Sequence, residues 1–367
     1  MDLDIVFLGT SGSVPTARRG LAGTLLRRGG ERLLFDCGEG TQRQLLRSKV
    51  GLVELPEVFL THYHADHYLG LPGMLKTFAL RGRETPLTVY GPPGLSELFA
   101  VLKRVFGKLS YKVELAELRP GDTLDRGDYA IAAFGVDHGV SAVGYALVEQ
   151  PRPGRFDVEA ARALGVPEGP FFGRLQHGEE IEVPGGSRVR PEQVLGPPRP
   201  GRKVVLAGDG RPGRSVLEAS RSADVLIHEA TFAFEEGDRA DETLHATATA
   251  AAQLALACEV RMLVLTHLSN RYFGPEILRE ARAVFPETVV PRDFDIIDVR
   301  FPERGGPRLV KRGAVGFQEK GEARGSDGSG RGREGSHGGG GDPDDLALGG
   351  HPVRAPARSG SAPDRPR

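Results

Sequence analysis

The chain has 367 residues, 39% of them hydrophobic and 26% charged, which is typical of one large or two smaller globular domains. The 48 basic and 49 acidic side chains leave a net charge of −1, which argues against a uniformly basic nucleic-acid binder. No apolar run reaches the ~18 residues of a membrane span, so no membrane association is expected. The acidic start MDLDIVFLGT does not have the pattern of a signal peptide. With only two cysteines, Cys37 and Cys258, we expect a cytoplasmic protein without disulfides.

The first 150 residues alternate short apolar runs with turns that are rich in glycine. Runs bounded by Gly, Pro or Asp predict β-strands, and apolar residues at helical spacing predict α-helices between them. The expected strands are 4–9, 32–37, 58–61, 87–90 and 129–136, and the expected helices are 70–80 and 94–106. This alternation indicates an α/β protein.

Residues 151–202 differ in composition, because Pro, Gly and Arg dominate both ends of the segment. Between these ends we expect a short helix over 158–164 and a β-hairpin over 180–189 that turns on Gly185 and Gly186. The pattern predicts a small insertion carried on two stalks.

Strand and helix signals return after the insertion and stop near residue 310. We expect strands over 203–207 and 262–266 and an Ala-rich helix over 243–258. Residues 313–367 contain almost no large apolar side chains, which predicts a disordered tail rich in Gly, Arg and Pro. The predicted organisation is therefore a catalytic domain over 1–310 with an insertion at 151–202, followed by this tail.

Four of the apolar strands end at a histidine or an aspartate. The first is followed by a run with four potential metal ligands in six residues, and the other three end at a distant His, Asp and His. The full set is His62, His64, Asp66, His67, His138, Asp209 and His267. Strand ends converge on one edge of an α/β sandwich, so we expect these side chains to meet there.

Imidazoles and carboxylates in this number suit two metal ions such as zinc, with one carboxylate shared. Two ions 3.5–4 Å apart can activate water and clamp both oxygens in a displacement reaction. The alternatives are ordinary core or surface histidines, or a structural zinc site. The density of ligands disfavours the first, and the lack of cysteine ligands disfavours the second.

The H-x-H-x-D-H run and the later ligands resemble the metallo-β-lactamase superfamily over about residues 1–305. Further segments resemble the ribonuclease Z family, namely 7–12 (FLGTSG), 228–231 (HEAT), 266–272 (THLSNRY) and, inside the insertion, 169–173 (GPFFG). This resemblance implies a four-layer αββα metallo-β-lactamase sandwich whose insertion is a tRNA-binding arm. It also implies a homodimer that cleaves the 3′ trailer from precursor tRNA.

The resemblance implies a role for each ligand, with two Zn²⁺ ions per subunit. His62, His64 and His138 would hold one ion, Asp66, His67 and His267 the other, and Asp209 would bridge them. Asp66 would also orient the attacking water. His245 would protonate the leaving 3′ oxygen, and Glu229 would hold that imidazole in place. From the residues alone, His245 could equally cap or pack near the start of the Ala-rich helix.

Other residues are candidates for binding the substrate. Ser269 and Arg271 are plausible phosphate contacts, although a surface salt bridge would explain Arg271 as well. For the arm we expect contacts from Arg152, Arg155, Arg174, Arg199 and Arg202.

The sequence departs from the family at residues 15–20 (PTARRG), where many bacterial members have P-x-K-x-R-N. That loop is associated with sensing the CCA end, so discrimination of CCA is in doubt. The alternative function is a small-molecule phosphodiesterase or sulfatase-like hydrolase on the same fold, which has no evident need for an arm. A β-lactamase fits less well, because Asp66 and Asp209, rather than a Cys or Ser ligand, favour phosphodiesters. A non-catalytic RNA-binding subunit fits less well, because all seven ligand positions hold competent side chains.

Overall fold

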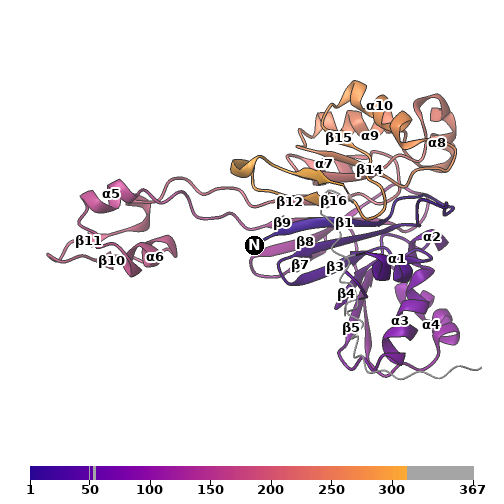
Figure 1. Ribbon diagram of the computed structural model, residues 1–367, viewed down its shortest axis with the longest axis horizontal. Coiled ribbons are helices and arrows are strands. Elements are labelled where there is room, and N and C mark those ends of the chain that lie inside the picture. The colour runs from indigo at the N-terminus through magenta and orange to yellow at the C-terminus, as the bar shows by residue number, and fades with distance from the viewer. Residues whose placement is uncertain (49, 53–54, 312–367) are drawn as a thin grey trace, which may run out of the picture. The chain divides into compact units, whose positions relative to one another are not determined.

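Two β-sheets packed face to face form the centre of the protein, and helices cover the outer face of each (Figure 1). The computed structural model describes residues 1–48, 50–52 and 55–311. The predicted disordered tail lies outside these residues. Among the helices that are described, none is both long and apolar enough to cross a bilayer.

The first sheet runs in the order β17 (Arg308–Val310), β16 (Ile296–Asp298), β1 (Leu3–Gly9), β2 (Gly23–Arg28), β3 (Glu31–Phe35), β4 (Glu57–Phe59), β5 (Leu87–Gly91) and β6 (Val113–Glu117). The strands from β3 to β6 are parallel, whereas β17, β16, β1, β2 and β3 pair in antiparallel fashion. The parallel strands are joined through helices, as such crossovers require.

The second sheet runs in the order β15 (Thr288–Val289), β14 (Leu263–Thr266), β13 (Val225–Glu229), β12 (Lys203–Leu206), β9 (Val143–Glu149), β8 (Tyr129–Gly135) and β7 (Thr123–Asp125). The strands from β12 to β15 are parallel, so their carboxyl ends lie at one edge. This edge carries the candidate site.

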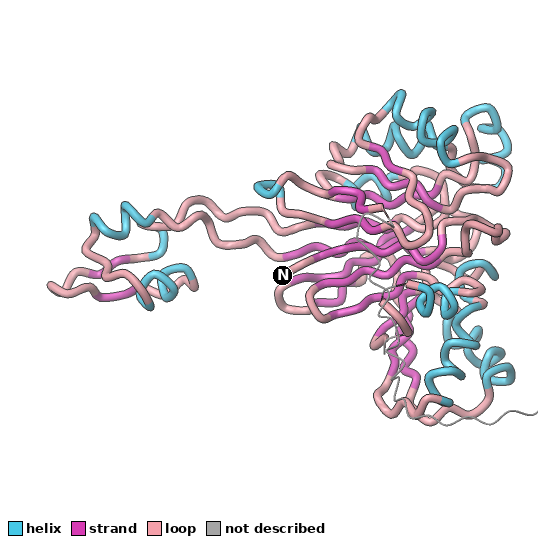
Figure 2. The backbone as a smooth tube through the Cα atoms, in the orientation of Figure 1, coloured by secondary structure: helices cyan, strands magenta, loops and turns pink. Residues whose placement is uncertain are grey.

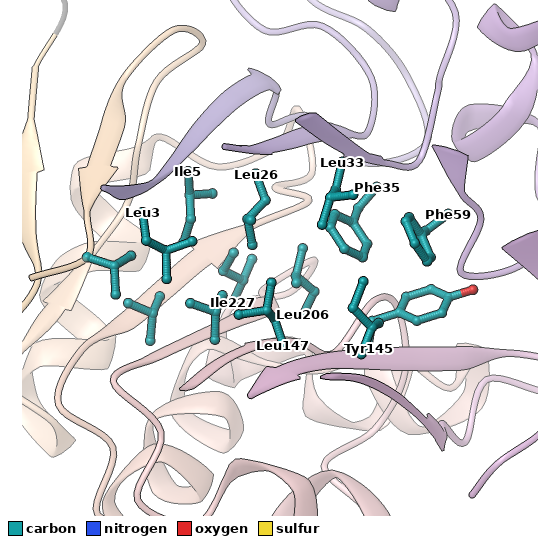
Figure 3. Packing of buried hydrophobic residues seen from close by; sticks show 14 of the residues in the cluster. Leu3, Ile5, Leu26, Leu33, Phe35, Phe59, Tyr145, Leu147, Leu206 and Ile227 are labelled. Atoms are coloured by element: carbon teal, nitrogen blue, oxygen red, sulfur yellow. The ribbon is translucent and has the colours of Figure 1, made fainter. Parts of the chain in front are cut away.

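The core between the sheets consists of the inward side chains of both (Figure 3). Phe35 and Phe59 stack with ring centroids 4.9 Å apart, and Tyr145 from the opposite sheet meets the edge of Phe59 at 5.4 Å. The buried Tyr145 hydroxyl donates to the Leu60 carbonyl at 2.7 Å, which satisfies its polar end.

Helices cover both outer faces and complete four layers, which confirms the predicted αββα sandwich. On the first sheet lie α1 (Thr41–Arg47), α2 (Ala65–Tyr68), α3 (Gly70–Leu80) and α4 (Leu95–Phe106). On the second lie α7 (Arg214–Ser220), α8 (Gly237–Thr243), α9 (Ala248–Ala257) and α10 (Gly274–Val284). The predicted helices over 70–80 and 94–106 are confirmed to within one residue.

The single helix expected over 243–258 is wrong at its start. Helix α8 ends before Leu244, which has a left-handed backbone with φ of 57°. Helix α9 begins only at Ala248, where the Thr247 side chain accepts a hydrogen bond from the Ala250 N–H as an N-cap. His245 therefore lies in a turn between two helices rather than inside one.

The insertion has a small hydrophobic core of its own. It contains α5 (Val158–Ala163), α6 (Pro170–Gln176), the hairpin of β10 (Ile181–Glu182) and β11 (Arg188–Val189), and a 3₁₀ turn over Pro191–Gln193. Its buried side chains, among them Ala161, Leu175 and Val189, form a separate cluster. Figure 2 shows the two segments that lead into and out of it running side by side.

The two stalks approach closely at a glycine. A Cβ atom on Gly154 would lie 1.9 Å from the Gly196 carbonyl oxygen, so any side chain there would force the segments apart. The backbones of Arg152 and Arg199 bond reciprocally at 2.7 and 2.9 Å. The insertion thus leaves and re-enters the sandwich at adjacent points.

Candidate metal centre

The edge formed by strand ends brings all seven expected ligands together. His62 follows β4, His138 follows β8, Asp209 follows β12 and His267 follows β14, while His64, Asp66 and His67 lie at the start of α2. Their ligand atoms form overlapping groups in which every atom lies within 4.8 Å of the others. These groups are His62–His64–His138, Asp66–His67–His267 and His62–His67–Asp209.

Two of the histidines are fixed from behind by Asp36. The Asp36 carboxylate accepts from His67 Nδ1 at 2.9 Å and from the Thr61 hydroxyl at 3.0 Å. Thr61 Oγ1 lies 3.0 Å from His62 Nδ1 and is free to accept from it. Both rings therefore direct Nε2 into the cluster. Such outer partners fix the tautomer and orientation of metal-binding histidines.

Two further rings are held in the same way by other groups. His138 Nδ1 donates to the Leu244 carbonyl at 3.1 Å, and His267 Nδ1 lies 2.9 Å from Thr231 Oγ1. Their Nε2 atoms also face the cluster, since His267 Nε2 is 2.9 Å from Asp209. Four histidines thus present the same nitrogen to one space.

The imidazole nitrogens that face one another in this space suit a bound cation better than hydrogen bonds between the rings. His138 Nε2 faces His64 Nδ1 at 3.1 Å, and His67 Nε2 faces His267 Nε2 at 3.4 Å. Two neutral imidazoles cannot both donate across such contacts. Within the described residues, the buried His62 Nε2 has no hydrogen-bond partner, an arrangement that is costly unless something binds it. The donors present match the ligands that zinc prefers.

The charges in the cluster oppose one another strongly. Burial, with the nearby His67, lowers the pKa of His62. Burial would also lower the pKa of His267, but Asp209 and Asp66 outweigh it and raise that pKa to about 10. Burial would raise the pKa of Asp209, but His267 and His67 hold it well below its usual range. The two carboxylates therefore supply fixed negative charge to whatever cation the site holds.

His245 lies at the rim of the cluster and is held by Glu229. Its Nδ1 is 2.8 Å from Glu229 Oε1, and its ring lies 4.7 Å from the His138 ring. Glu229 is buried and also accepts from the Gly210 N–H at 2.7 Å and the Thr231 hydroxyl at 2.5 Å. Burial would lower the pKa of His245, but Glu229 outweighs it and raises that pKa.

A loop from β1 closes over the Asp66 side of the cluster. The Ser13 N–H donates to Asp66 Oδ2 at 2.8 Å, and Asp66 Oδ2 also lies 3.2 Å from His267 Nε2. A Cβ atom on Gly12 would come within 2.5 Å of His267 Nδ1, so only glycine lets the loop approach this ring. The loop therefore fixes the carboxylate expected to orient water.

The expected phosphate contacts Ser269 and Arg271 lie in the loop after His267. The Arg271 guanidinium donates to Glu236 at 2.8 Å and to the Ser269 hydroxyl at 3.3 Å, and its side chain stays 37% exposed. This arginine therefore makes the salt bridge considered from sequence and still presents donors to solvent.

The arginines expected in the arm differ in their surroundings. Arg155 is exposed, and Arg174 pairs with Glu179 at 2.8 Å on the surface. Arg152 and Arg199 both pair with Glu303, at 2.8 and 3.2 Å. The base of each stalk is thus attached to the C-terminal part of the sandwich.

The assignment of Arg202 to the RNA surface is wrong in this structure. Its side chain is 3% exposed and donates to Glu149 at 2.7 Å and to the carbonyls of Val299 and Met1. The guanidinium also lies 4.2 Å from the centre of the Phe301 ring. Arg202 is an interior ion-pair partner, because every face of its guanidinium is already engaged.

Sequence reasoning did not find the residues that hold the ligands. Asp36, Thr61, Thr231 and Ser13 all bond to a ligand or to Glu229, yet each is a common turn or strand-end residue, and Thr231 was noted only as the last letter of the HEAT segment. The one available signal is that Asp36 and Thr61 also follow strands, β3 and β4, as the ligands do.

Comparisons with known proteins identify the same class of protein as the fold and the site do. A profile of the metallo-beta-lactamase superfamily matches residues 23–267. Ribonuclease Z of Methanosarcina acetivorans is 47% identical over 302 residues, which cover 82% of this chain and 99% of that protein. Ribonuclease Z of Myxococcus xanthus is 47% identical over 305 residues, with 82% and 99% covered.

A solved structure agrees with these relatives. The crystal structure of the short form of human tRNase Z (ELAC1) superposes with a TM-score of 0.60 at 28% sequence identity, covering 81% of this chain and 100% of that one. The chain belongs to the ribonuclease Z family of the metallo-β-lactamase superfamily.

Proposed function

We propose that the protein is a zinc-dependent endoribonuclease that removes the 3′ trailer from precursor tRNA. Cleavage would leave a 3′-hydroxyl on the tRNA and a 5′-phosphate on the trailer. The observation that carries this proposal is the Glu229–His245 pair, a proton donor held at 2.8 Å beside a cluster of metal ligands. The names of the relatives support tRNA as the substrate.

Two zinc ions per subunit fit the ligand set best. His62, His64 and His138 would hold one ion, and Asp66, His67 and His267 the other. Asp209, whose carboxylate meets both His67 and His267, would be shared. When bound, such ions supply an activated water and stabilise charge on the phosphoryl oxygens.

The chain's own residues orient the reaction. Asp66 Oδ2 is fixed by Ser13 and His267 and faces the cluster, where it can accept a proton from the attacking water. Glu229 binds His245 through Nδ1, which leaves Nε2–H to protonate the departing 3′ oxygen. Against the effect of burial, Glu229 raises the pKa of His245, which favours the protonated imidazole that this step requires.

RNA phosphates would bind outside the cluster. Ser269 and Arg271 would contact the phosphate backbone, and the arm would bind the folded tRNA through Arg155 and Arg174, with Arg152 and Arg199 at its base. We further propose a cytoplasmic homodimer in which the arm of one copy holds the tRNA cut by the other. An arm with its own core is also the feature that disfavours the small-molecule phosphodiesterase alternative.

The decisive experiment is cleavage of a 3′-extended precursor tRNA by the purified protein, with and without a chelator. We expect one chelator-sensitive cut next to the discriminator nucleotide, or just after an encoded CCA. Mapping the product ends would also show what the altered loop at 15–20 permits. Bound zinc with turnover of a small phosphodiester but no cut in the tRNA would refute the proposal.

A further inference from the structure

A cavity of about 1010 Å³ lies beside the metal centre but contains none of its ligands. Its walls come from the loop after β1, from α1, from α10 and from the segment between β15 and β17. Six exposed cations line it, namely Arg18, Arg43, Arg47, Arg282, Arg292 and Lys311. This concentration of positive charge contrasts with the net charge of −1 of the whole chain.

Much of this positive charge is not neutralised by the protein. Considering the described residues only, the side chains of Arg18, Arg43, Arg292 and Lys311 have no ion-pair or hydrogen-bond partner. The cavity therefore offers free cationic donors to an anionic ligand, and guanidinium groups suit phosphate in particular.

The described carboxylates of the cavity do not cancel these cations, because two of the three, Asp293 and Asp295, already accept hydrogen bonds from the protein. Asp293 accepts from Thr10 at 2.8 Å, from the Gly20 N–H at 2.7 Å and from Gln44 at 2.6 Å. Asp295 is buried and accepts from the Arg292 N–H at 2.9 Å. Among the described residues that line the cavity, only Glu39 adds an exposed negative charge.

One loop connects this cavity to the metal centre. Its first part contacts the ligands, since the Ser13 N–H bonds to Asp66 and Ser11 pairs with Leu268, next to His267. Its second part, 15–20, forms a wall of the cavity, where Arg19 donates to the Pro291 carbonyl at 2.9 Å. An RNA strand that passes the metal centre can therefore reach the cavity along this loop.

We propose that this cavity binds the sugar-phosphate backbone of the single-stranded 3′ trailer, an inference that rests on the function proposed above. On the tRNA side of the cut, one unpaired discriminator nucleotide is followed by the rigid acceptor duplex. On the other side the RNA is single-stranded and can bend into a pocket. The unpaired arginines of the cavity can bind phosphates whatever the base sequence, which suits a trailer of variable sequence.

The test compares two substrates that share one tRNA. One carries a single-nucleotide trailer and the other an unstructured ten-nucleotide trailer. The variant is Arg43→Glu with Arg292→Glu, which reverses two unpaired charges without touching the metal centre. The matched control is Arg81→Glu with Arg104→Glu, two exposed arginines of the described chain that do not line the cavity.

We expect the cavity variant to lower kcat/KM on the long trailer by about tenfold or more, and to reduce its salt dependence, because phosphate contacts are lost. Cleavage of the single-nucleotide trailer should stay within about twofold of the unmodified chain, as for the control pair, because that substrate does not reach the cavity. Unchanged melting temperature would show that the fold is intact.

Two results would overturn the inference. Equal losses on both substrates would mean that the cavity serves the tRNA body or the fold, and no loss on either would mean that the trailer passes elsewhere. Neither result resembles failure of the proposed function, in which the unmodified chain would cut neither substrate.

Discussion

Four of the imidazoles in the candidate metal site are fixed from behind by buried partners, whereas two arginines at the base of the arm pair with a carboxylate at the surface. His67 is hydrogen-bonded to Asp36, and His138 is hydrogen-bonded to the Leu244 carbonyl. Arg152 and Arg199 instead share the exposed Glu303. Buried hydrogen bonds in a low dielectric fix geometry tightly, while exposed pairs are screened by water and salt.

This difference matches the two tasks that we propose. A proton donor must stay within hydrogen-bond reach of the atom it serves, so small displacements reduce the rate. An arm that recognises the shape of a folded RNA can tolerate adjustment on binding. Variants of the catalytic cluster and of the arm should therefore affect the chemical step and RNA binding separately.

The largest effect is expected at the proton donor. Replacing His245 with Asn should lower the rate of precursor tRNA cleavage by about 10²–10⁴-fold, the usual contribution of general acid catalysis, while bound zinc is retained. Single-turnover kinetics and metal analysis would measure both. The control is His177→Asn, a histidine of the arm outside the cluster, which should leave the chemical step unchanged. A His245→Asn enzyme with full rate would remove this residue from the mechanism.

A smaller and selective effect is expected from removing the arm. Replacing residues 155–198 with a short glycine linker should lower kcat/KM on precursor tRNA by about tenfold or more, because phosphate contacts are lost. Hydrolysis of a small chromogenic phosphodiester should persist. The paired backbones of Arg152 and Arg199 keep the cut ends adjacent, so the sandwich should still fold. Full activity on tRNA after the deletion would show that the arm does not bind the tRNA during cleavage.

The smallest effect on catalysis is expected where the stalks meet the sandwich. Burial would raise the pKa of Glu149, but its hydrogen bonds from Arg202 lower it. A lowered folded-state pKa gives stability that is present above the unfolded-state pKa and is lost as the pH falls through the folded-state pKa. Replacing Glu149 with Gln should therefore cost about 3–5 kcal/mol of unfolding free energy at neutral pH, because Arg202 is left buried without a counter-charge.

Urea titrations of the zinc-loaded protein at several pH values would test this. The difference between Glu149→Gln and the unmodified chain should shrink as the pH falls, and the exposed control Glu235→Gln should show no such trend. A difference independent of pH would mean that packing, rather than charge, makes Glu149 important.

The sequence predicted well which side chains lie together at the strand ends, because these are rare residue types concentrated where apolar runs stop. His62 to His67 form a local motif, and the strands before Asp209 and His267 are short apolar runs with clear ends. Strand β2 and strand β13 were not among the predicted elements. The helix start near His245 was misplaced because an Ala-rich pattern gives no sign of the left-handed Leu244.

The arm contacts could not be predicted in the same way. Arg202 and Arg155 look alike in a stretch that is rich in Pro, Gly and Arg, yet one is buried against Glu149 and the other is exposed. Only the fold decides which arginine meets a carboxylate distant in sequence. Ranking charged residues for binding therefore needs the partners that tertiary structure brings to them.

The turn at Leu244 has a consequence for how this enzyme can be improved. Its carbonyl accepts from His138, and the next residue is His245, so one strained backbone position holds the proposed metal ligand and places the proposed proton donor. A side chain in the left-handed region costs about 1–2 kcal/mol that glycine would recover. Engineering for heat resistance would favour glycine here, and selection for turnover would oppose it, because the freedom gained would loosen two histidines together.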